Sequence, residues 1–523
     1  MSPRTDGMLH GFDADTGDEV FGYIPNNLML NEYSRNITNL LDFNYEHKYF
    51  VDLTPAVNDV YIDKDGDGDK EWTTLLVGGH GAGAKAYFAL DVTDPDALTE
   101  ANAENVVLWE FTEDDDSYPT ESDGMGGQVP LTDSDGNQRQ DLQSPAQPIK
   151  DLGYTFSVPT LAMSNLTEDV DGETVHKWVA VTGNGYNSTS GIAKLFVLFL
   201  EGGLDGTWCH PDLEYNDTIA DDGSIPAECV GAEQDFVKLD TTFGAQDGLP
   251  NGLGIPRLID IDANGTVDYV YAGDYFGNLF RFNLTSEDFD DWSVEKIFEA
   301  QYDDGSTLTP QPITTQPIVV EHPSQPDGFI VIFTTGSYIT VPDGTSTEIQ
   351  SIYGIWDRLA PELISKDDLV QQRYINKEGF EDEGITGPDR VRNLTSNPVN
   401  YNDGDRGWFN DLDSVAPGGA QDTDPAEFPG ERAIRRLLLR GGLVFVNSVI
   451  PKTQNSCVRT AGGALLSFCP ETGGASCLIQ SVFDVNNDGD FNDLTDDGQV
   501  RCTGAVDRGR EAADGLRHSS RTS

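Results

Sequence analysis

The segment 260–268 carries oxygen donors at a spacing that suits calcium chemistry. The donors stand at positions 1, 3, 5, 7 and 9 of the loop, and they are Asp260, Asp262, Asn264, the main-chain carbonyl of Thr266, and Asp268. Position 6 is Gly265, and a glycine there permits the sharp turn of a calcium loop. Calcium is a hard cation that prefers an oxygen-rich, flexible cage of this kind. The spacing therefore predicts a Ca2+ site.

The residues on either side of this loop are typical of strands. The flanking runs PRLIDI and YVYAG are rich in β-branched and aromatic residues and lack a helical period. Position 12, where an EF-hand carries its bidentate glutamate, is Tyr271. We therefore expect a strand–loop–strand calcium clip and not an EF-hand.

Two further segments repeat the acidic spacing, again with glycine at position 6. In the first, the donors are Asp63, Asp65, Asp67, the main-chain carbonyl of Asp69, and Glu71. In the second, they are Asp484, Asn486, Asp488, the main-chain carbonyl of Asp490, and Asn492. Aspartate and glycine are also favoured in ordinary turns, and an acidic chain produces such patterns by chance. Both segments are candidates for calcium, with a plain acidic turn as the alternative.

The elements that would position these loops are strands. No long stretch shows sustained helical spacing of apolar residues, and the 55 glycines suit many short strands joined by tight turns. DGMLHGFDADTG (residues 6–17) and FGNLFRFNLTS (276–286) superimpose, with looser copies at 86–95 and 193–203. Repeated strand pairs that cannot bury a face alone predict a β-propeller or a sandwich array. The wide spacing of the copies predicts long insertions between strands.

The composition along the chain suggests where those insertions lie. We expect an all-β, N-terminally truncated propeller over residues 1–452, with surface insertions at 112–151, 210–252 and 360–432. We expect a Cys-rich C-terminal extension with an acidic loop over 453–505, and a disordered or artefactual tail over 506–523.

The charge balance is extreme, with 90 acidic against 32 basic residues and a net charge of −58. Such a surface repels nucleic acid and anionic membranes, because both are bound through Lys and Arg contacts. Two explanations of the acidity remain, namely divalent-cation binding and adaptation to high salt, where screening removes the self-repulsion. We expect a halophilic protein in which a few acidic loops are true ligand sets.

The cysteines predict disulfides and an oxidising compartment. There are six of them, with no CxxC pair, in two groups: Cys209 and Cys229, then Cys457, Cys469, Cys477 and Cys502. Cys209 and Cys229 are alone in their region and are the safest pair, while the last four cysteines allow three connectivities. Buried free thiols are the alternative.

The sequence shows no apolar run long enough to span a membrane and no signal-peptide region at its start. Disulfides without an export signal are contradictory, so we expect a fragment of a longer exported chain. Motifs of nucleophilic, zinc, phosphate or dinucleotide sites (GxSxG, HExxH, Walker A, GxGxxG) are absent, and we expect no enzymatic activity.

Several ordered blocks match a known family. They include DGMLHGFDADTG from Asp6, HKYFVDLTPAVND from His47, LLVGGHGAGAKAYFALDVTDP from Leu75, WVAVTGNGYNS from Trp178, the block from Asp260, and SIYGIWD from Ser351. With these blocks the chain resembles the C-terminal β-propeller domain of the PilY/PilC proteins, which are tip adhesins and biogenesis factors of type IV pili. The resemblance spans roughly residues 6–490.

The resemblance implies a modified propeller with quinoprotein-like blades at the pilus tip, the periplasm or the outer membrane surface. It implies roles in pilus assembly, twitching motility and adhesion, with major and minor pilins and host or abiotic surfaces as partners. In this family a calcium loop controls extension against retraction, and here it maps onto Asp260, Asp262, Asn264 and Asp268. Asn264 stands where aspartate is commoner, which lowers the ligand charge.

Two other functions remain open. One is an envelope scaffold protein in which calcium only stiffens loops. The other is a quinoprotein dehydrogenase, because the blade repeat also looks like the pyrroloquinoline-quinone propellers. Those enzymes carry two adjacent cysteines under the quinone, whereas no two cysteines are adjacent here.

Overall fold

The structure is a computed structural model, and it describes most of the chain. The described residues are 2–3, 6–29, 37–118, 120–122, 128–130, 149–209, 229, 234–246, 248–323, 328–379, 390–412, 430–451, 462–475 and 503–507. Nearly all regular structure in these residues is β, which confirms the expected all-β class.

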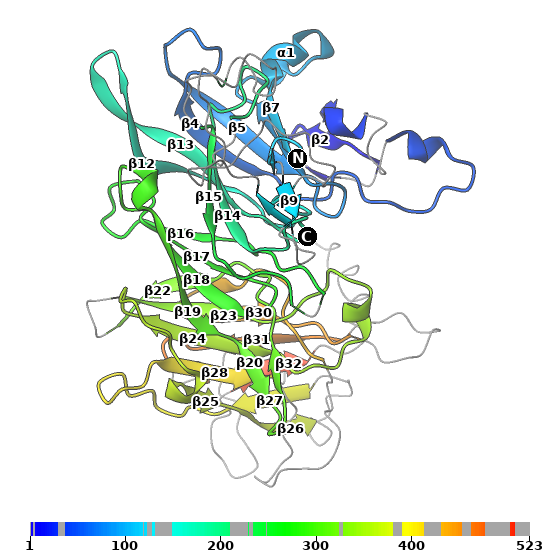
Figure 1. The fold of residues 1–523 in the computed structure, drawn as a ribbon. Helices are drawn as coiled ribbons and strands as arrows, with labels where there is room; N and C mark the ends of the chain where they lie inside the picture. Colours follow the sequence, from blue (N-terminus) through cyan, green and yellow to red (C-terminus); the bar gives the residue numbers. More distant parts are fainter. Residues whose placement is uncertain are drawn as a thin grey trace. The chain divides into compact units, whose positions relative to one another are not determined.

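Four-stranded sheets recur along the described chain, and their strands follow one another in sequence order (Figure 1). The first contains β4 (Ala56–Ile62), β5 (Glu71–Gly79), β6 (Ala86–Asp91) and β7 (Val107–Thr112). The second contains β12 (Thr160–Val170), β13 (Glu173–Gly183), β14 (Lys194–Phe199) and β15 (Phe236–Asp240). The third contains β16 (Arg257–Ile259), β17 (Tyr269–Gly273), β18 (Asn278–Asn283) and β19 (Ser293–Glu299).

Two larger sheets follow in the C-terminal half. A five-stranded sheet has the order β22 (Ile318–Glu321), β23 (Phe329–Thr334), β24 (Ser351–Asp357), β28 (Gly407–Asp411) and β25 (Val370–Gln372). A six-stranded sheet has the order β26 (Tyr374–Gly379), β27 (Arg390–Leu394), β32 (Thr503–Asp507), β31 (Ala464–Phe468), β30 (Leu443–Asn447) and β29 (Leu438–Arg440).

The remaining elements are short. The small sheets are β1 (Ser2–Pro3), β2 (Leu9–Phe12) and β3 (Glu19–Tyr23), then β8 (Ser117–Tyr118) with β11 (Ile149–Lys150), β9 (Thr120–Ser122) with β10 (Gln128–Pro130), and β20 (Gln301–Asp303) with β21 (Leu308–Pro310). Helix α1 (Ala103–Val106) is a single turn, and the 3-10 helices are η1 (Asn26–Leu28), η2 (Ile37–Leu41), η3 (Pro95–Ala97), η4 (Glu100–Asn102), η7 (Phe289–Asp291), η8 (Pro342–Thr345) and η9 (Lys366–Asp368). Within the described residues, no helix is long and apolar enough to cross a membrane.

The chain divides into two compact units, one of Met1–Val270 with Arg281–Glu295 and the other of Tyr271–Phe280 with Lys296–Ser523. In the first unit, a core cluster joins the β4–β7 and β12–β15 sheets, and it includes Phe111 and Phe236, whose ring centroids are 5.0 Å apart. In the second unit, a cluster joins the five- and six-stranded sheets around Trp408. Inward-facing apolar residues on the central strands of these sheets account for both cores.

Three of the four copies of the sequence repeat share a structural feature at the end of their strand. Asp13 after β2, Asp91 at the end of β6 and Asn283 at the end of β18 each accept a hydrogen bond from the backbone N–H two residues ahead, at 3.0, 2.9 and 3.0 Å. Asp and Asn favour this local turn, which stops a strand and sends the chain to the next one. The repeat therefore encodes a strand followed by an Asx turn.

Segments that looked like plain insertions also supply strands. β28 lies within 360–432, and its Trp408 is fully buried in the core of the second unit. β15 lies within 210–252 and completes the second four-stranded sheet. β31 lies within 453–505, β32 extends from that segment into 506–523, and both pair in the six-stranded sheet. Single short strands of this kind lack the repeated pattern by which the others are recognised.

A disulfide and a buried tryptophan hold the start of the second insertion (210–252) against the core of the first unit. Cys209 and Cys229 form a disulfide with a Cα–Cα distance of 5.5 Å, which confirms the predicted pair. Trp208 packs edge-on against Phe111 with ring centroids 4.9 Å apart, and it donates from its indole N–H to the carbonyl of Glu110. Cys469 is disulfide-bonded as well, while Cys457, Cys477 and Cys502 lie outside the described residues.

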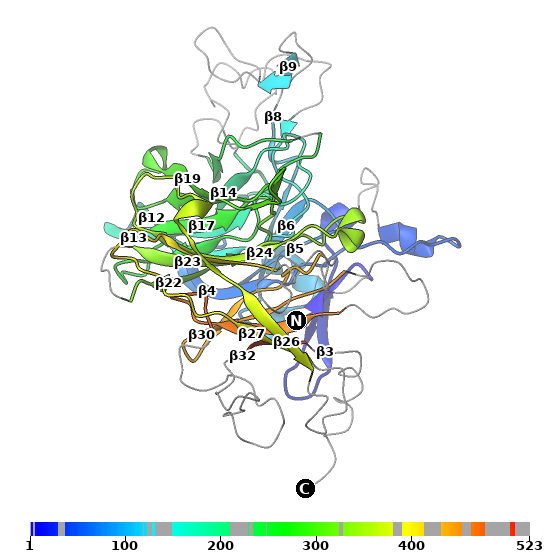
Figure 2. The same cartoon turned by 90° about the horizontal axis from the view of Figure 1, so that it is seen from below.

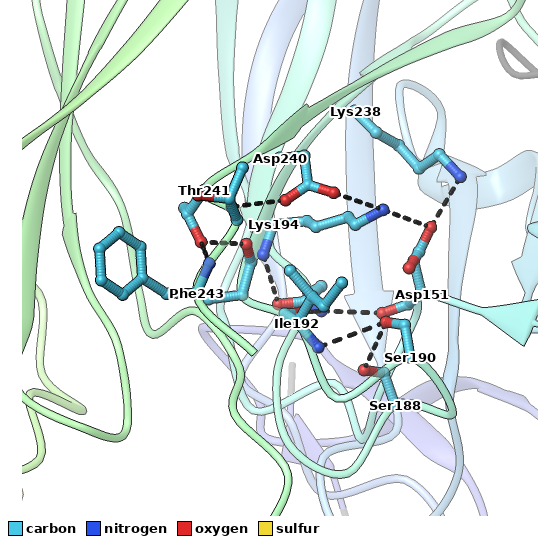
Figure 3. A network of polar contacts seen from close by, with 12 residues as sticks. Asp151, Ser188, Ser190, Ile192, Lys194, Lys238, Asp240, Thr241 and Phe243 are labelled. Carbon is cyan, nitrogen blue, oxygen red and sulfur yellow. Dashed lines mark hydrogen bonds and ion pairs between the residues drawn. The ribbon is translucent and has the colours of Figure 1, made fainter. Parts of the chain in front are cut away.

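A buried charge network holds the root of the first insertion, where β8 and β9 extend away from β5 and β6 (Figure 2). Figure 3 shows the Asp151 carboxylate between two lysines, with Nζ of Lys194 at 3.0 Å and Nζ of Lys238 at 2.8 Å from Oδ2. Lys238 also pairs with Asp116 (3.1 Å), which accepts the backbone N–H groups of Asp151 and Leu152. The two aspartates flank the insertion, so this network fixes both of its ends to β14 and β15.

Candidate metal centre

The loop between β16 and β17 brings its carboxylates together. Asp260, Asp262 and Asp268 each offer an oxygen, and these oxygens lie within 4.8 Å of one another. Such a convergence places like charges close together, which is costly unless a cation or hydrogen-bond donors offset the repulsion. The prediction that these three residues meet in one cluster agrees with the geometry, while occupation by Ca2+ stays a prediction.

Backbone N–H groups orient the carboxylates of this loop, which comprises residues 260–268 and is called the 260 loop below. The Asp260 carboxylate accepts from the N–H groups of Gly265 (2.8 Å) and Asn264 (3.3 Å), and the latter N–H also reaches Asp262 (3.1 Å). Burial opposes ionisation of Asp260, but together the backbone N–H groups of Gly265, Ala263 and Asn264 hold the pKa of this carboxyl below its ordinary value. The loop is therefore prepared to keep Asp260 charged, as a ligand for a hard cation must be.

Gly265 is required by its conformation and its neighbour. Its φ is +97°, a left-handed value that favours glycine. A Cβ placed on it would lie 3.0 Å from the Met163 side chain. The glycine at position 6 thus performs the turn that the spacing predicted.

The predicted ligands differ in exposure. Asp268 is buried, and its carboxylate accepts the Ile261 N–H at 2.8 Å, which closes the loop across its ends. Thr266 is also buried, and its N–H and hydroxyl both donate to the Asn264 side-chain oxygen at 2.7 and 2.6 Å. The Asn264 oxygen is therefore already an acceptor in the position that the spacing assigns to a ligand.

A residue that the sequence analysis missed connects this loop to the neighbouring sheet. Asn165 of β12 is buried, and its amide donates to the carbonyls of Val267 (2.9 Å) and Leu284 (3.0 Å). Its side-chain oxygen lies 2.8 Å from the Thr266 hydroxyl, whose one proton it shares with the Asn264 oxygen, and the Val267 N–H donates to the Met163 carbonyl. The loop is thus bonded to β12 at Thr266 and Val267, and a change in the loop would reach that strand.

The loop between β4 and β5, which comprises residues 63–71 and is called the 63 loop below, is arranged differently. The carboxylates of Asp63, Asp65 and Asp67 form the second cluster within 4.8 Å, but Glu71 at position 9 is absent from it. Glu71 instead pairs with Nζ of Lys64 at 3.1 Å. Asp69 was predicted through its main-chain carbonyl only, and its side chain is exposed.

Glu201, which lies outside the 63 loop, forms hydrogen bonds with two of its residues. Glu201 accepts the Asp63 N–H at 2.7 Å and Nζ of Lys70 at 2.6 Å. Lys70 also pairs with Glu168 of β12. Because Lys70 supplies a positive charge within the loop, we expect the 63 loop to bind a cation less tightly than the 260 loop.

The third predicted loop lies outside the described residues. Its residues are Asp484, Asn486, Asp488, Asp490 and Asn492. Calcium at this loop stays a prediction.

The chemistry that the 260 loop supports is binding of a hard cation. All of its converging side chains offer oxygen, with carboxylates at positions 1, 3 and 9, and oxygen donors suit Ca2+ better than softer metals. Ca2+ also tolerates the irregular geometry of a short loop, whereas Mg2+ demands a near-ideal octahedron.

Comparison with known proteins gives one consistent result. The profile of the PilY1 beta-propeller domain matches residues 2–208 and 236–364. A type IV pilus biogenesis factor PilY1 homolog of Xylella fastidiosa is 31% identical over 481 residues, which cover 90% of this chain and 26% of the relative. The type IV pilus biogenesis factor PilY1 of Pseudomonas aeruginosa is 28% identical over 528 residues, which cover 93% of this chain and 37% of the relative.

A solved structure supports the same relationship. The crystal structure of the Pseudomonas aeruginosa PilY1 C-terminal domain aligns with a TM-score of 0.63 and 27% identity, over 97% of this chain and 86% of that one. The propeller architecture expected from the repeats is thereby confirmed. The chain spans only about a quarter to two fifths of the curated relatives that it matches.

Proposed function

The chain belongs to the family of PilY1 β-propeller domains, and we propose that it is the calcium-binding propeller of a type IV pilus biogenesis factor. In this proposal it supports pilus assembly, the balance of extension and retraction, and surface adhesion. The observation that carries the calcium part is the convergence of Asp260, Asp262 and Asp268 in one loop that is bonded to β12. The pilus part rests on the biogenesis factors that the chain resembles.

In the proposed mechanism, binding of a cation makes the 260 loop more rigid. Without a cation, the three carboxylates repel one another, and the loop is held by hydrogen bonds within itself and to Asn165. With Ca2+ bound, the repulsion becomes attraction, and the loop stiffens against Asn165 of β12. A partner that docks on this edge then meets either an ordered or a loosened surface.

The proposed partners and compartment follow from the family. We expect major and minor pilins to be partners, with host or abiotic surfaces as adhesion ligands, and we expect a binding module and not an enzyme. The disulfide between Cys209 and Cys229 supports an oxidising location outside the cytoplasm, such as the periplasm, the outer membrane surface or the pilus tip.

The test is thermal unfolding during a calcium titration at fixed ionic strength, because the net charge of −58 makes stability sensitive to salt. Calcium should raise the melting temperature of the wild type, and Asp260→Ala should lose most of this rise. Glu287→Ala, which removes an exposed carboxylate outside the loops, is the matched control and should keep the rise. A rise that survives Asp260→Ala but not Asp63→Ala would move the site to the 63 loop.

The proposed role in pilus assembly and retraction is tested in cells that carry the Asp260→Ala substitution in the complete pilus protein. Altered pilus number or twitching, with normal protein levels, would support control by the loop. Normal pili combined with a lost calcium response in vitro would leave calcium a purely structural role, as in the scaffold alternative.

A further inference from the structure

A groove of about 790 Å³ lies beside the 63 loop, within the first compact unit. Its walls come from Lys64, Asp65 and Gly66 of that loop, from the stretch between β6 and β7 that contains η3, η4 and α1, and from the turn after β14 at Leu204 and Asp205. This volume is in the range of sites that hold a small ligand or a short peptide segment. The groove is distinct from the loop between β16 and β17.

The groove has an apolar floor and acidic walls. The floor is formed by Val106, Leu108 and Leu204, which are all partly buried and pack on the core clusters below. The walls carry carboxylates, which belong to Asp65, Asp91, Asp94, Glu104 and Asp205. Partly buried apolar side chains next to more exposed carboxylates suit a ligand side chain with an apolar stem and a cationic head.

Most of these carboxylates are not neutralised within the described part of the chain. Lys64 lines the groove but is already held by Asp91 (2.6 Å) and Glu71 (3.1 Å). Asp94 and Asp205 each accept one backbone N–H, from Asp96 and Thr207 respectively, and neither is in an ion pair. Glu104, which is exposed on α1, is likewise in no ion pair with a described residue. A ligand that brings positive charge would meet carboxylates that no lysine or arginine of the described residues occupies.

We propose that this groove binds a basic segment of a partner protein, with Lys or Arg stems on the floor and their heads at Asp94, Glu104 and Asp205. Charge complementarity argues for this occupant, because anionic partners are repelled by a chain of net charge −58. An uncharged partner would leave the carboxylates partly desolvated without compensation. The inference stands apart from the calcium proposal, since none of these three carboxylates belongs to a predicted calcium loop.

The test uses the whole chain and a fluorescent peptide of glycine, serine and several arginines. Its control peptide carries citrulline in place of arginine, which keeps the stem and removes the charge. Binding is measured by fluorescence anisotropy in about 0.15 M salt, first with chelator and then with calcium. The triple variant D94N/E104Q/D205N removes the charges and keeps the side-chain acceptors that cap the local turns. The matched variant E46Q/E173Q/E287Q removes the same charge from exposed positions elsewhere.

The arginine peptide should bind the wild type, and the groove variant should bind it about tenfold more weakly. The matched variant should stay within about twofold of the wild type, and the citrulline peptide should not bind measurably. Equal losses in the two variants would overturn the proposal, because they would show only long-range attraction to an acidic protein. No binding of the arginine peptide to the wild type would overturn it too. If calcium weakens peptide binding to the wild type while the groove variant still binds about tenfold more weakly, the proposed groove is supported. Calcium at the 63 loop would then reduce the affinity of the groove for the peptide.

Discussion

At the scale of single residues, the 260 loop balances repulsion against order. Asn264 occupies position 5 and donates from its amide to Asp262 at 3.3 Å, while its oxygen accepts from Thr266. An aspartate there would keep the acceptor but lose that donor. The identity of this one side chain therefore sets both the affinity for a cation and the stability of the loop without one.

The variant Asn264→Asp separates these two effects. We expect it to bind Ca2+ more tightly, because it adds a fourth carboxylate to the set, and to melt at a lower temperature in chelator, because the added charge faces Asp262. Calorimetric titration gives the affinity, and thermal unfolding in chelator gives the stability. Weaker calcium binding by this variant would show that the side chain at position 5 is not a ligand.

Asp235 is a second residue whose environment sets its protonation. Burial raises the pKa of its carboxyl to about 6, the Cys209 N–H opposes this rise, and the charge of Asp205 adds to it. The folded state therefore binds this proton more tightly than the unfolded chain, whose aspartate has a pKa of about 3.9. Its contribution to stability is fully present below about pH 4 and is lost as the pH rises through about 6.

The prediction is that Asp235→Asn stabilises the protein at pH 8 by about 1–2 kcal/mol and has little effect near pH 4. The asparagine oxygen can still accept the Cys209 N–H, which now bonds Asp235 at 2.7 Å. Denaturant unfolding at both pH values measures the difference. A stabilisation that is the same at both pH values would assign the effect to packing and not to the carboxyl charge.

At the scale of elements, the buried network of Figure 3 fixes the strands around the first insertion. Burial raises the pKa of the Asp151 carboxyl. The charges of Lys238 and Lys194 lower it by more, so this pKa lies well below its ordinary value. A carboxyl with a depressed pKa stabilises the fold above the unfolded pKa, and this stability is lost as the pH falls through the acid range.

Replacing Asp151 by asparagine should cost about 3–5 kcal/mol at pH 7, because it leaves two buried ammonium groups short of a counter-charge. The cost should shrink below about pH 4, where the wild-type carboxylate becomes protonated as the chain unfolds. Asp240→Asn is the control, since Asp240 pairs with the same Lys194 at 3.1 Å but is 41% exposed, and it should cost less than about 1 kcal/mol. Equal costs for the two variants would contradict the role of burial.

Local chemistry explains which elements could be predicted. The turn at Gly265 and the Asx turns after β2, β6 and β18 each depend on residues within a few positions, so the pattern of spacing reveals them. The contact of Asn165 with Val267 joins residues 102 positions apart, and that of Glu201 with Asp63 joins residues 138 apart. A lone Asn or Glu carries no local signal of such a partner, so the support of both loops could be found only in three dimensions.

The same argument applies to strands outside the repeat. β15 and β28 are each five residues long, and each is separated by a long polar stretch from the earlier strand with which it pairs, β14 for β15 and β24 for β28. Their hydrophobic faces are visible in the sequence, but the segments around them are polar. The register that places Trp408 in the core comes from pairing with β24 and could not be inferred from the segment itself.

At the scale of the whole molecule, the dominant quantity is the net charge of −58. Ion pairs within the described residues engage only a minority of the 90 acidic side chains, because the chain has only 32 lysines and arginines. The folded state brings these charges closer together than the unfolded chain does, so their repulsion opposes folding. Salt shortens the screening length from about 30 Å at 0.01 M to about 3 Å at 1 M.

We therefore expect the free energy of unfolding to rise strongly with salt between about 0.01 and 1 M, the range over which the screening length falls below the spacing of surface charges. Denaturation by urea, which carries no charge, measures this rise in potassium chloride. Choline chloride at equal ionic strength is the control, because its large cation screens charge but cannot enter a carboxylate cluster. Equal rises in the two salts would identify screening as the cause, whereas a rise in potassium chloride alone would mean that cations bind specific sites. A stability independent of salt would contradict the expectation that this acidic surface is adapted to a saline environment.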